Sequence, residues 1–234
     1  MLRRLGAATV SRAAARRARE ARLDLLPPQA LRHVHTAIDV GANEGRWATA
    51  VAELARPERL IAVEPSPEVV QRLRANLGST AGVTIIEAAV GDSIGRATLH
   101  LTAHDHNASL SPPRSEEMDE LYTAYGPGYA VTDHVNVELT TLDEIARGLD
   151  EISLLKVDVQ GSERAVLDGA ERTLERVRWL LIECNFRSHY EDDMLFPELH
   201  ACLVERGFVL TGLAAPFVLG GVALWCDSLY TKTS

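Results

Sequence analysis

Short apolar runs of strand length alternate with longer amphipathic stretches from His35 onward, and this alternation limits the fold more than any other feature. It is typical of βαβ units around a parallel sheet. We expect strands at 36–40, 59–63, 83–90, 152–157 and 177–183, and helices at 44–55, 67–77, 162–175 and 194–206. Further strands are expected at 95–102, 135–139, 208–213 and 221–230, with a short helix from Leu142. The sequence predicts a doubly wound α/β fold with a mostly parallel, seven-stranded sheet.

The chain starts with an arginine-rich segment. Its first 22 residues hold seven arginines and one acid, Glu20, and Pro27-Pro28 ends the segment because proline cannot continue a helix. We expect a helical extension over 1–32 and a single catalytic domain over 33–234. A cap on the domain, a contact in a homo-oligomer, a transit peptide and a surface-binding helix all remain open for the extension.

Charge and composition limit the partners. A net charge of -9 argues against a nucleic-acid binder, which needs a concentrated positive surface. No apolar run reaches the roughly 20 residues that a membrane helix needs, so we expect no stable membrane insertion. The three cysteines are odd in number and widely spaced, which is typical of reduced thiols. We therefore expect a cytoplasmic protein that acts on a small molecule.

A glycine-containing turn follows the first predicted strand and marks the expected ligand site. Asp39, Gly41, Asn43 and Gly45 lie where this strand turns into the first helix, and an α/β sheet binds its ligand at such a crevice. Glycine allows close backbone approach to a ligand. A tight turn without any ligand is the alternative reading of the glycine pair alone.

An acid at the end of the second strand adds to this site. Glu64, followed by Pro65, can accept hydrogen bonds from two ribose hydroxyls. The dinucleotide fingerprint is missing, because Asn43 and Arg46 stand where its second and third glycines belong. An adenosine cofactor without a phosphate bridge therefore fits better than a nicotinamide dinucleotide.

Four segments occur in order, IDVGANEG, VEPSPEVVQRLRANL, AAVGD and LLKVDVQGSERAVLDGA, and they resemble the FkbM-type methyltransferase family over about residues 36 to 230. The resemblance implies a Rossmann-like class I fold and S-adenosyl-L-methionine as cofactor. It also implies that the cofactor binds at Asp39, Gly41, Asn43, Gly45, Glu64 and Pro65, with Glu87, Ala89 or Asp92 beside the adenine.

The reactive side is expected at the ends of the fourth and fifth main strands. Lys156 and Asp158 point to one side of a strand end, and an ion pair between Lys156 and Asp158 or Glu163 is the structural alternative. Asp158 is the first candidate for a general base and Glu183 the second, and His189 follows on the next loop. Family members usually carry glutamate where this chain has Gln160, which weakens any metal site there.

A long polar loop over 103–133 is the expected acceptor side. In the family a related stretch faces the active site, which implies His106, Asn107 and Ser109 as acceptor-binding residues. His104, Asp105 and His106 also suggest a divalent metal such as Mg²⁺, but their spacing is not diagnostic, so we predict no metal.

These features favour O-methylation of a hydroxyl on a sugar, glycolipid or secondary metabolite. An N-methyltransferase for a small amine and a non-catalytic methyltransferase-like binding protein are the alternatives. An oxidoreductase is disfavoured by the glycine spacing.

Overall fold

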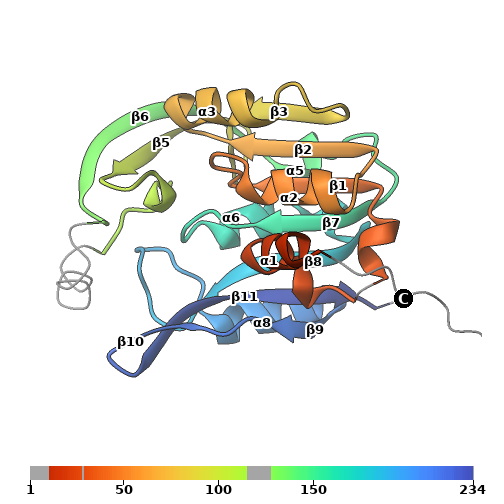
Figure 1. Cartoon of the computed structure of the whole chain (residues 1–234). Coiled ribbons are helices and arrows are strands. Elements are labelled where there is room, and N and C mark those ends of the chain that lie inside the picture. Colours follow the sequence, from red (N-terminus) through yellow and green to blue (C-terminus); the bar gives the residue numbers. More distant parts are fainter. Residues whose placement is uncertain (1–10, 28, 115–127, 234) are drawn as a thin grey trace, which may run out of the picture.

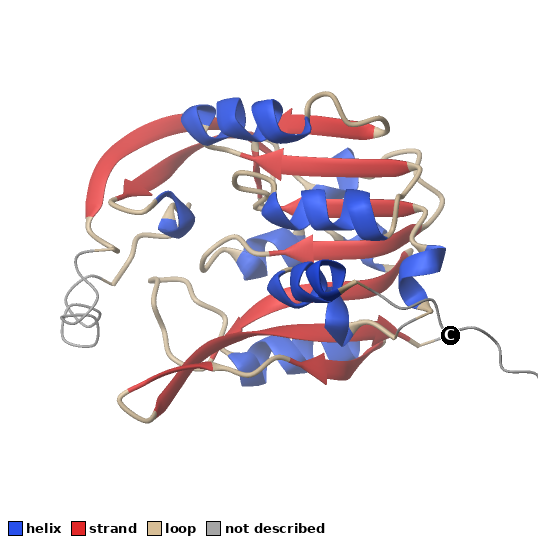
Figure 2. Cartoon of the chain, viewed as in Figure 1, coloured by secondary structure: helices blue, strands red, loops and turns tan. Residues whose placement is uncertain are grey.

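The computed structural model describes residues 11–27, 29–114 and 128–233. Its main sheet has eight strands, in the order β10-β11-β8-β7-β1-β2-β3 with β9 paired to β11 (Figures 1 and 2). The bounds are β1 Thr36–Val40, β2 Arg59–Glu64, β3 Val83–Glu87, β7 Ile152–Val157, β8 Val177–Asn185, β9 Phe208–Leu213, β10 Phe217–Leu219 and β11 Val222–Lys232. Strands β1, β2, β3, β7 and β8 run parallel to their neighbours in this group.

The sheet is mixed, where the sequence pattern predicts a mostly parallel sheet of seven strands. Strand β11 runs antiparallel to β8, β9 and β10. The eighth strand, β10, has only three residues and is joined to β11 through Gly220 and Gly221, both at positive φ. A two-residue hairpin of this kind forces antiparallel pairing, and so short a strand leaves no periodic signal in the sequence.

Helices cover both faces of the sheet. Helices α1 (Arg12–Glu20), α2 (Arg46–Leu54) and α3 (Pro67–Leu77) lie on one face, where Val51 and Leu73 pack with Leu154 of β7. Helices α5 (Leu142–Ile145), α6 (Glu163–Asp168), α7 (Glu171–Leu174) and α8 (Phe196–Glu205) contribute to the core on the other face. The expected single helix over 162–175 is two helices, because the chain turns at Gly169, where a side chain would overlap the carbonyl oxygen of Gly91.

A second sheet of three strands, in the order β4-β6-β5, projects beyond the end of the main sheet, on the left in Figure 1. Its strands are β4 Ala89–Val90, β5 Gly95–Thr102 and β6 Val131–Thr140. The expected strand over 83–90 is therefore divided: residues after Glu87 leave β2 and pair with β6 instead. Strand β6 also starts earlier than the expected 135–139, and residues 115–127 of the expected loop lie outside the described part.

The described part of the arginine-rich segment, from residue 11 onward, packs against the domain. After α1, the short 3-10 helices η1 (Leu23–Leu25) and η2 (Ala30–His33) bury Leu23 and Ala30 in the same core as α2. The boundary between 1–32 and 33–234 stays a prediction. Among the described helices, none is long and apolar enough to cross a membrane.

Candidate functional site

The turn after β1 has the shape that its glycines allow. Gly41, Asn43 and Gly45 all have positive φ, at 78°, 49° and 84°. A side chain at Gly41 would overlap the carbonyl oxygen of Asp158, and one at Gly45 would come within 2.6 Å of Leu77. Both glycines are therefore needed to seat the turn against the end of β7 and against α3. Gly41 also lines a cavity beside the turn, which is described below. Gly45 is not among the residues that line that cavity.

Glu64 turns inward beside this turn. Its side chain is 6% exposed, and its two oxygens accept the backbone N–H groups of Asn43 and Ser66, each at 3.0 Å. Burial raises the pKa of Glu64 to about 7, against the opposing effect of these two hydrogen bonds. A carboxylate has about four acceptor positions, so Glu64 keeps capacity for further donors.

A cavity extends from Glu64 toward Ser109, and we call it the adenosine cavity after the ligand that the sequence resemblance implies for it. Apolar side chains form much of its wall, and Asn43, Pro65, His106 and Asp158 also line it. Its apolar lining comprises Val40, Val63, Ala88, Ala89, Val90, Leu99, Ala108, Leu110 and Val159. Among the described residues that line it there is no lysine or arginine.

Besides Gly45, three of the predicted cofactor residues lie away from this cavity. Glu87 is half exposed and pairs with Arg74 at 3.0 Å, and Asp92 is exposed and accepts a hydrogen bond from Ser93. Asp39 is fully buried beneath the turn, 3.4 Å from the ammonium of Lys156. Burial raises the pKa of Asp39 to about 6, with Lys156 opposing the shift. Asp39 is therefore a buried ion-pair partner of Lys156 and not a lining residue of this cavity.

Lys156 forms ion pairs with two carboxylates, one on β1 and one at the end of β7. Its Nζ lies 3.4 Å from Asp39 and 3.1 Å from Asp158, and its side chain is 11% exposed. Burial alone would lower the pKa of Lys156, but the two carboxylates outweigh it and raise the pKa. The ion pair that the sequence suggests between Lys156 and Asp158 is present. Glu163 does not pair with Lys156; its carboxylate accepts the backbone N–H groups of Val159 and Gly161.

Gln160 connects the two carboxyl groups of the reactive side. Its Nε2 donates to Asp158 Oδ1 at 2.7 Å and to Glu183 Oε2 at 2.8 Å. Burial favours the neutral form of Asp158, but Lys156 and the hydrogen bond from Gln160 lower its pKa below the ordinary value. Burial and the charge of Asp158 raise the pKa of Glu183 well above its ordinary value. The opposite shifts mean that a proton shared by the pair resides on Glu183 rather than on Asp158, which is the ionised acid.

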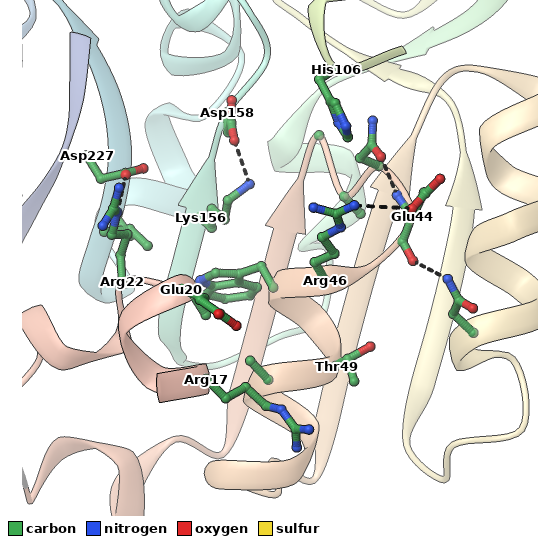
Figure 3. A pocket seen from close by; sticks show the side chains of 18 residues that line it. Arg17, Glu20, Arg22, Glu44, Arg46, Thr49, His106, Lys156, Asp158 and Asp227 are labelled. Carbon is green, nitrogen blue, oxygen red and sulfur yellow. Dashed lines mark hydrogen bonds and ion pairs between the residues drawn. The ribbon is translucent and has the colours of Figure 1, made fainter. Parts of the chain in front are cut away.

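A larger cavity, which we call the outer cavity, adjoins Asp158 on the face of the sheet covered by α1 and α2 (Figure 3). Its volume is about 960 Å³. Arg22 and Asp227 form an ion pair at 2.8 Å in its wall, and the ion pair of Lys156 and Asp158 lines it as well. Gly41, Asn43, His106 and Asp158 line both this cavity and the adenosine cavity, so the two meet above the turn.

The described part of the polar loop closes over the adenosine cavity. Ser109 donates to the backbone oxygen of Gln160 at 2.5 Å, and Asn107 donates to Gly128 at 3.0 Å. His106, in the short 3-10 helix η3 (Asp105–Asn107), lines both cavities, while Asp105 pairs with Arg72. Within residues 11–27, 29–114 and 128–233, no three His, Cys, Asp or Glu side chains are arranged to hold a metal ion.

Several lining residues were missed by sequence reasoning. Arg22 and Asp227 line the outer cavity, and Asn185 and Tyr190 line a smaller one near His189. Asp227 lies opposite Glu183 in the register of β8 and β11. Alternation along the last strand puts Asp227 on one face, but the pairing of β11 with β8 cannot be read from the sequence.

Comparison with known proteins identifies the family of the chain. The family model of the methyltransferase FkbM domain matches residues 39–210. The chain belongs to the FkbM methyltransferase family. This match confirms the family that the four sequence segments indicate, and it spans the turn, the reactive side and most of the main sheet.

Two relatives and one solved structure illustrate the FkbM likeness. The 2-O-methyltransferase NoeI of Sinorhizobium fredii is 28% identical over 167 residues, which are 67% of this chain and 66% of NoeI. Methyltransferase sdnD of Sordaria araneosa is 30% identical over 200 residues, 74% of this chain and 73% of sdnD. Methyltransferase FkbM from Methylobacillus flagellatus shares the fold, with a TM-score of 0.54 at 16% identity over 85% of this chain and 43% of that one.

The chain thus spans a little less than two thirds of NoeI and less than half of the Methylobacillus protein.

Proposed function

We propose that this FkbM-family chain uses S-adenosyl-L-methionine to methylate a hydroxyl group of a sugar, glycolipid or secondary metabolite. The observation that carries the proposal is the meeting of two cavities at Gly41 and Asp158, with buried Glu64 on one side and an ionised acid on the other. Relatives named as methyltransferases, one of them a 2-O-methyltransferase, support the reaction type.

The adenosine cavity suits the nucleoside part of the cofactor. Glu64 has acceptor capacity left for ribose hydroxyls, and the apolar wall that includes Ala89 and Leu110 suits a planar adenine ring. Asn43 and the backbone of Gly41 line both cavities, so the methionyl part would pass over the turn. When bound, the cofactor supplies an electrophilic methyl group.

Asp158 is the group proposed to take the proton of the acceptor hydroxyl. Its side chain is 32% exposed, lines both cavities and is ionised at neutral pH. Lys156 and Gln160 hold its carboxylate from two sides, at 3.1 Å and 2.7 Å. Displacement at a methyl group mainly requires alignment and removal of this proton, so few other residues are compulsory.

The experiment uses the full chain and calorimetric titration with S-adenosylhomocysteine. Wild type should bind the product, and Asp158→Asn should bind it with affinity within about threefold, because the adenosine contacts are intact. Turnover is followed as S-adenosylhomocysteine formed from a panel of methyl glycosides and alcohols. Asp158→Asn should lower kcat by about 100-fold or more, the usual effect of losing a general base.

Asp168→Asn is the matched control. Asp168 is the last residue of α6, is half exposed and pairs with Arg206, which directly follows α8. The substitution should leave both binding and turnover unchanged. Failure of wild type to bind S-adenosylhomocysteine would refute the proposal, and unchanged kcat in Asp158→Asn would remove Asp158 from the role of base.

A further inference from the structure

A small cavity lies beyond the ends of β7 and β8, apart from the turn that faces the cofactor. Its volume is about 190 Å³, and its wall includes Glu183, Asn185, His189 and Trp225. It shares Gln160 and His106 with the adenosine cavity, so it opens toward the place where Asp158 meets the cofactor. Pockets for whole drug-sized ligands occupy roughly 300 to 1,000 Å³, so this cavity has room for one ring of a larger acceptor.

The imidazole of His189 is the unusual group in this wall. The side chain is 2% exposed, and among the described residues its Nε2 has no hydrogen-bond partner. The residue is fixed in place: its N–H donates to Asp193, its carbonyl oxygen accepts from Arg114 N at 2.9 Å, and its ring meets Trp225 edge to face at 5.3 Å. A buried polar atom without a partner is rare in proteins, so a bound ligand is the natural partner for Nε2.

The surrounding charges select the kind of ligand. Glu183 lines the cavity beside Asp158 and Asp227, and among the described lining residues no lysine or arginine is present to pair with a phosphate or carboxylate. Burial lowers the pKa of His189 to about 4, so the imidazole is neutral and supplies no positive charge either. A hydroxyl group both donates and accepts, so it can pair with Nε2 in either tautomer of the ring.

We propose that this cavity receives one neutral, hydroxylated sugar ring of the acceptor, and that His189 Nε2 hydrogen-bonds to a ring hydroxyl other than the one that is methylated. The inference rests on the proposed function, because it places the acceptor beside Asp158. His189 then determines which sugar is bound, while Asp158 acts on a neighbouring hydroxyl. Trp225 supplies apolar surface for the carbon-bound hydrogens of the ring.

The test compares His189→Phe and His189→Gln with wild type on methyl glycosides of common hexoses and deoxyhexoses. Binding is read first, by saturation-transfer NMR with enzyme saturated with S-adenosylhomocysteine. Turnover is read as S-adenosylhomocysteine released from S-adenosylmethionine. For the preferred glycoside, His189→Phe should raise KM by about 10-fold with little change in kcat, as expected for one lost hydrogen bond. His189→Gln, whose amide reaches the position of Nε2, should recover part of this loss.

Deoxy analogues identify the hydroxyl. The analogue that lacks the partner of His189 should raise KM by a similar factor in wild type and by no further factor in His189→Phe. His200→Phe is the control, because His200 bonds to Tyr230 on the other side of the sheet. Affinity for S-adenosylhomocysteine should be unchanged in all three variants, which also shows that they fold.

The outcomes separate the two proposals. If wild type binds S-adenosylhomocysteine but no methyl glycoside, or if His189→Phe leaves KM for the glycoside unchanged, the sugar subsite is refuted and the methyltransferase proposal stands. If wild type does not bind S-adenosylhomocysteine, the proposed function itself fails.

Discussion

At the scale of single residues, Glu64 is buried, and the protein fills only about half of its hydrogen-bond acceptor positions. Its two hydrogen bonds come from the backbone, and its remaining acceptor positions adjoin the adenosine cavity. Because burial raises its pKa to about 7, the carboxyl group is ionised above this pH and protonated below it. Ribose hydroxyls donate best to the ionised form. Cofactor affinity should therefore be highest above about pH 7 and fall as the pH drops toward 5.

Calorimetric titration of S-adenosylhomocysteine between about pH 5.5 and pH 8.5 checks this prediction. Glu64→Gln should weaken binding at the higher pH by about 10- to 100-fold, the range for a hydrogen bond to a charged group, and should flatten the pH dependence. Glu87→Gln is the control, since Glu87 is the register partner of Glu64 on β3 but faces outward. An unchanged pH dependence in Glu64→Gln would contradict the assignment.

At the scale of elements, Arg72 of α3 holds two covering segments in place. Its guanidinium lies 3.1 Å from Glu44 in the turn after β1 and pairs with Asp105 of η3. This contact links α3, the turn and the polar loop beside the proposed cofactor site. Partly exposed ion pairs contribute about 0.2–1 kcal/mol each, so Arg72→Ala should raise KM for S-adenosylmethionine by about 2- to 30-fold with kcat little changed.

Arg74→Ala provides the comparison, because Arg74 lies on the same helix but pairs with Glu87 away from the cavity. Initial rates at varied cofactor concentration give both constants. Equal effects of the two substitutions would mean that Arg72 acts only through the stability of α3.

The elements that sequence patterns predict well are those with a repeated burial period. Strand β1 and helix α3 begin and end at the expected residues, because their apolar positions recur at the spacing of a strand and of a helix. Strand β4 was missed as a separate element because its two residues continue the apolar run of β3, and only pairing with β6 distinguishes them. Partners that are distant in sequence carry no periodic signal.

The residues of the candidate site also fall into those that sequence patterns predict and those that depend on distant strand pairing. Gly41, Glu64 and Asp158 follow predicted strands, so their common edge could be inferred from the alternation of strands and helices. Trp225 and Asp227 could not, because their place depends on the antiparallel register of β11 beside β8. The pairing of Gln160 with both acids depends on its positive φ of 55°, which has no sequence signature in a glutamine.

At the scale of the whole molecule, Arg22 ties the arginine-rich segment to the last strand. Its backbone has a φ of 56°, and its guanidinium pairs with Asp227, 205 residues later. A left-handed conformation costs a residue other than glycine roughly 1–2 kcal/mol. Arg22→Ala should lower the free energy of unfolding, because it loses the ion pair with Asp227. The strained backbone is kept in this variant, so nothing offsets the loss.

Arg22→Gly should be more stable than Arg22→Ala by about 1 kcal/mol, since glycine adopts this conformation without the penalty. Urea denaturation of both variants and of wild type measures the difference. If the alanine variant were the more stable of the two, the backbone at this position would not be strained in solution.

The pairing of Arg22 with Asp227 also sets an order of assembly during translation. The residues that line the adenosine cavity end at Ser162, whereas the wall of the outer cavity needs Asp227. Ribosomes deliver the chain from the N-terminus, so the lining residues of the adenosine cavity emerge first, and Arg22 has no Asp227 to pair with until the last strand, β11, is made. A nascent chain therefore contains every lining residue of the proposed methyl-donor cavity before it contains the full wall of the chamber proposed for the acceptor.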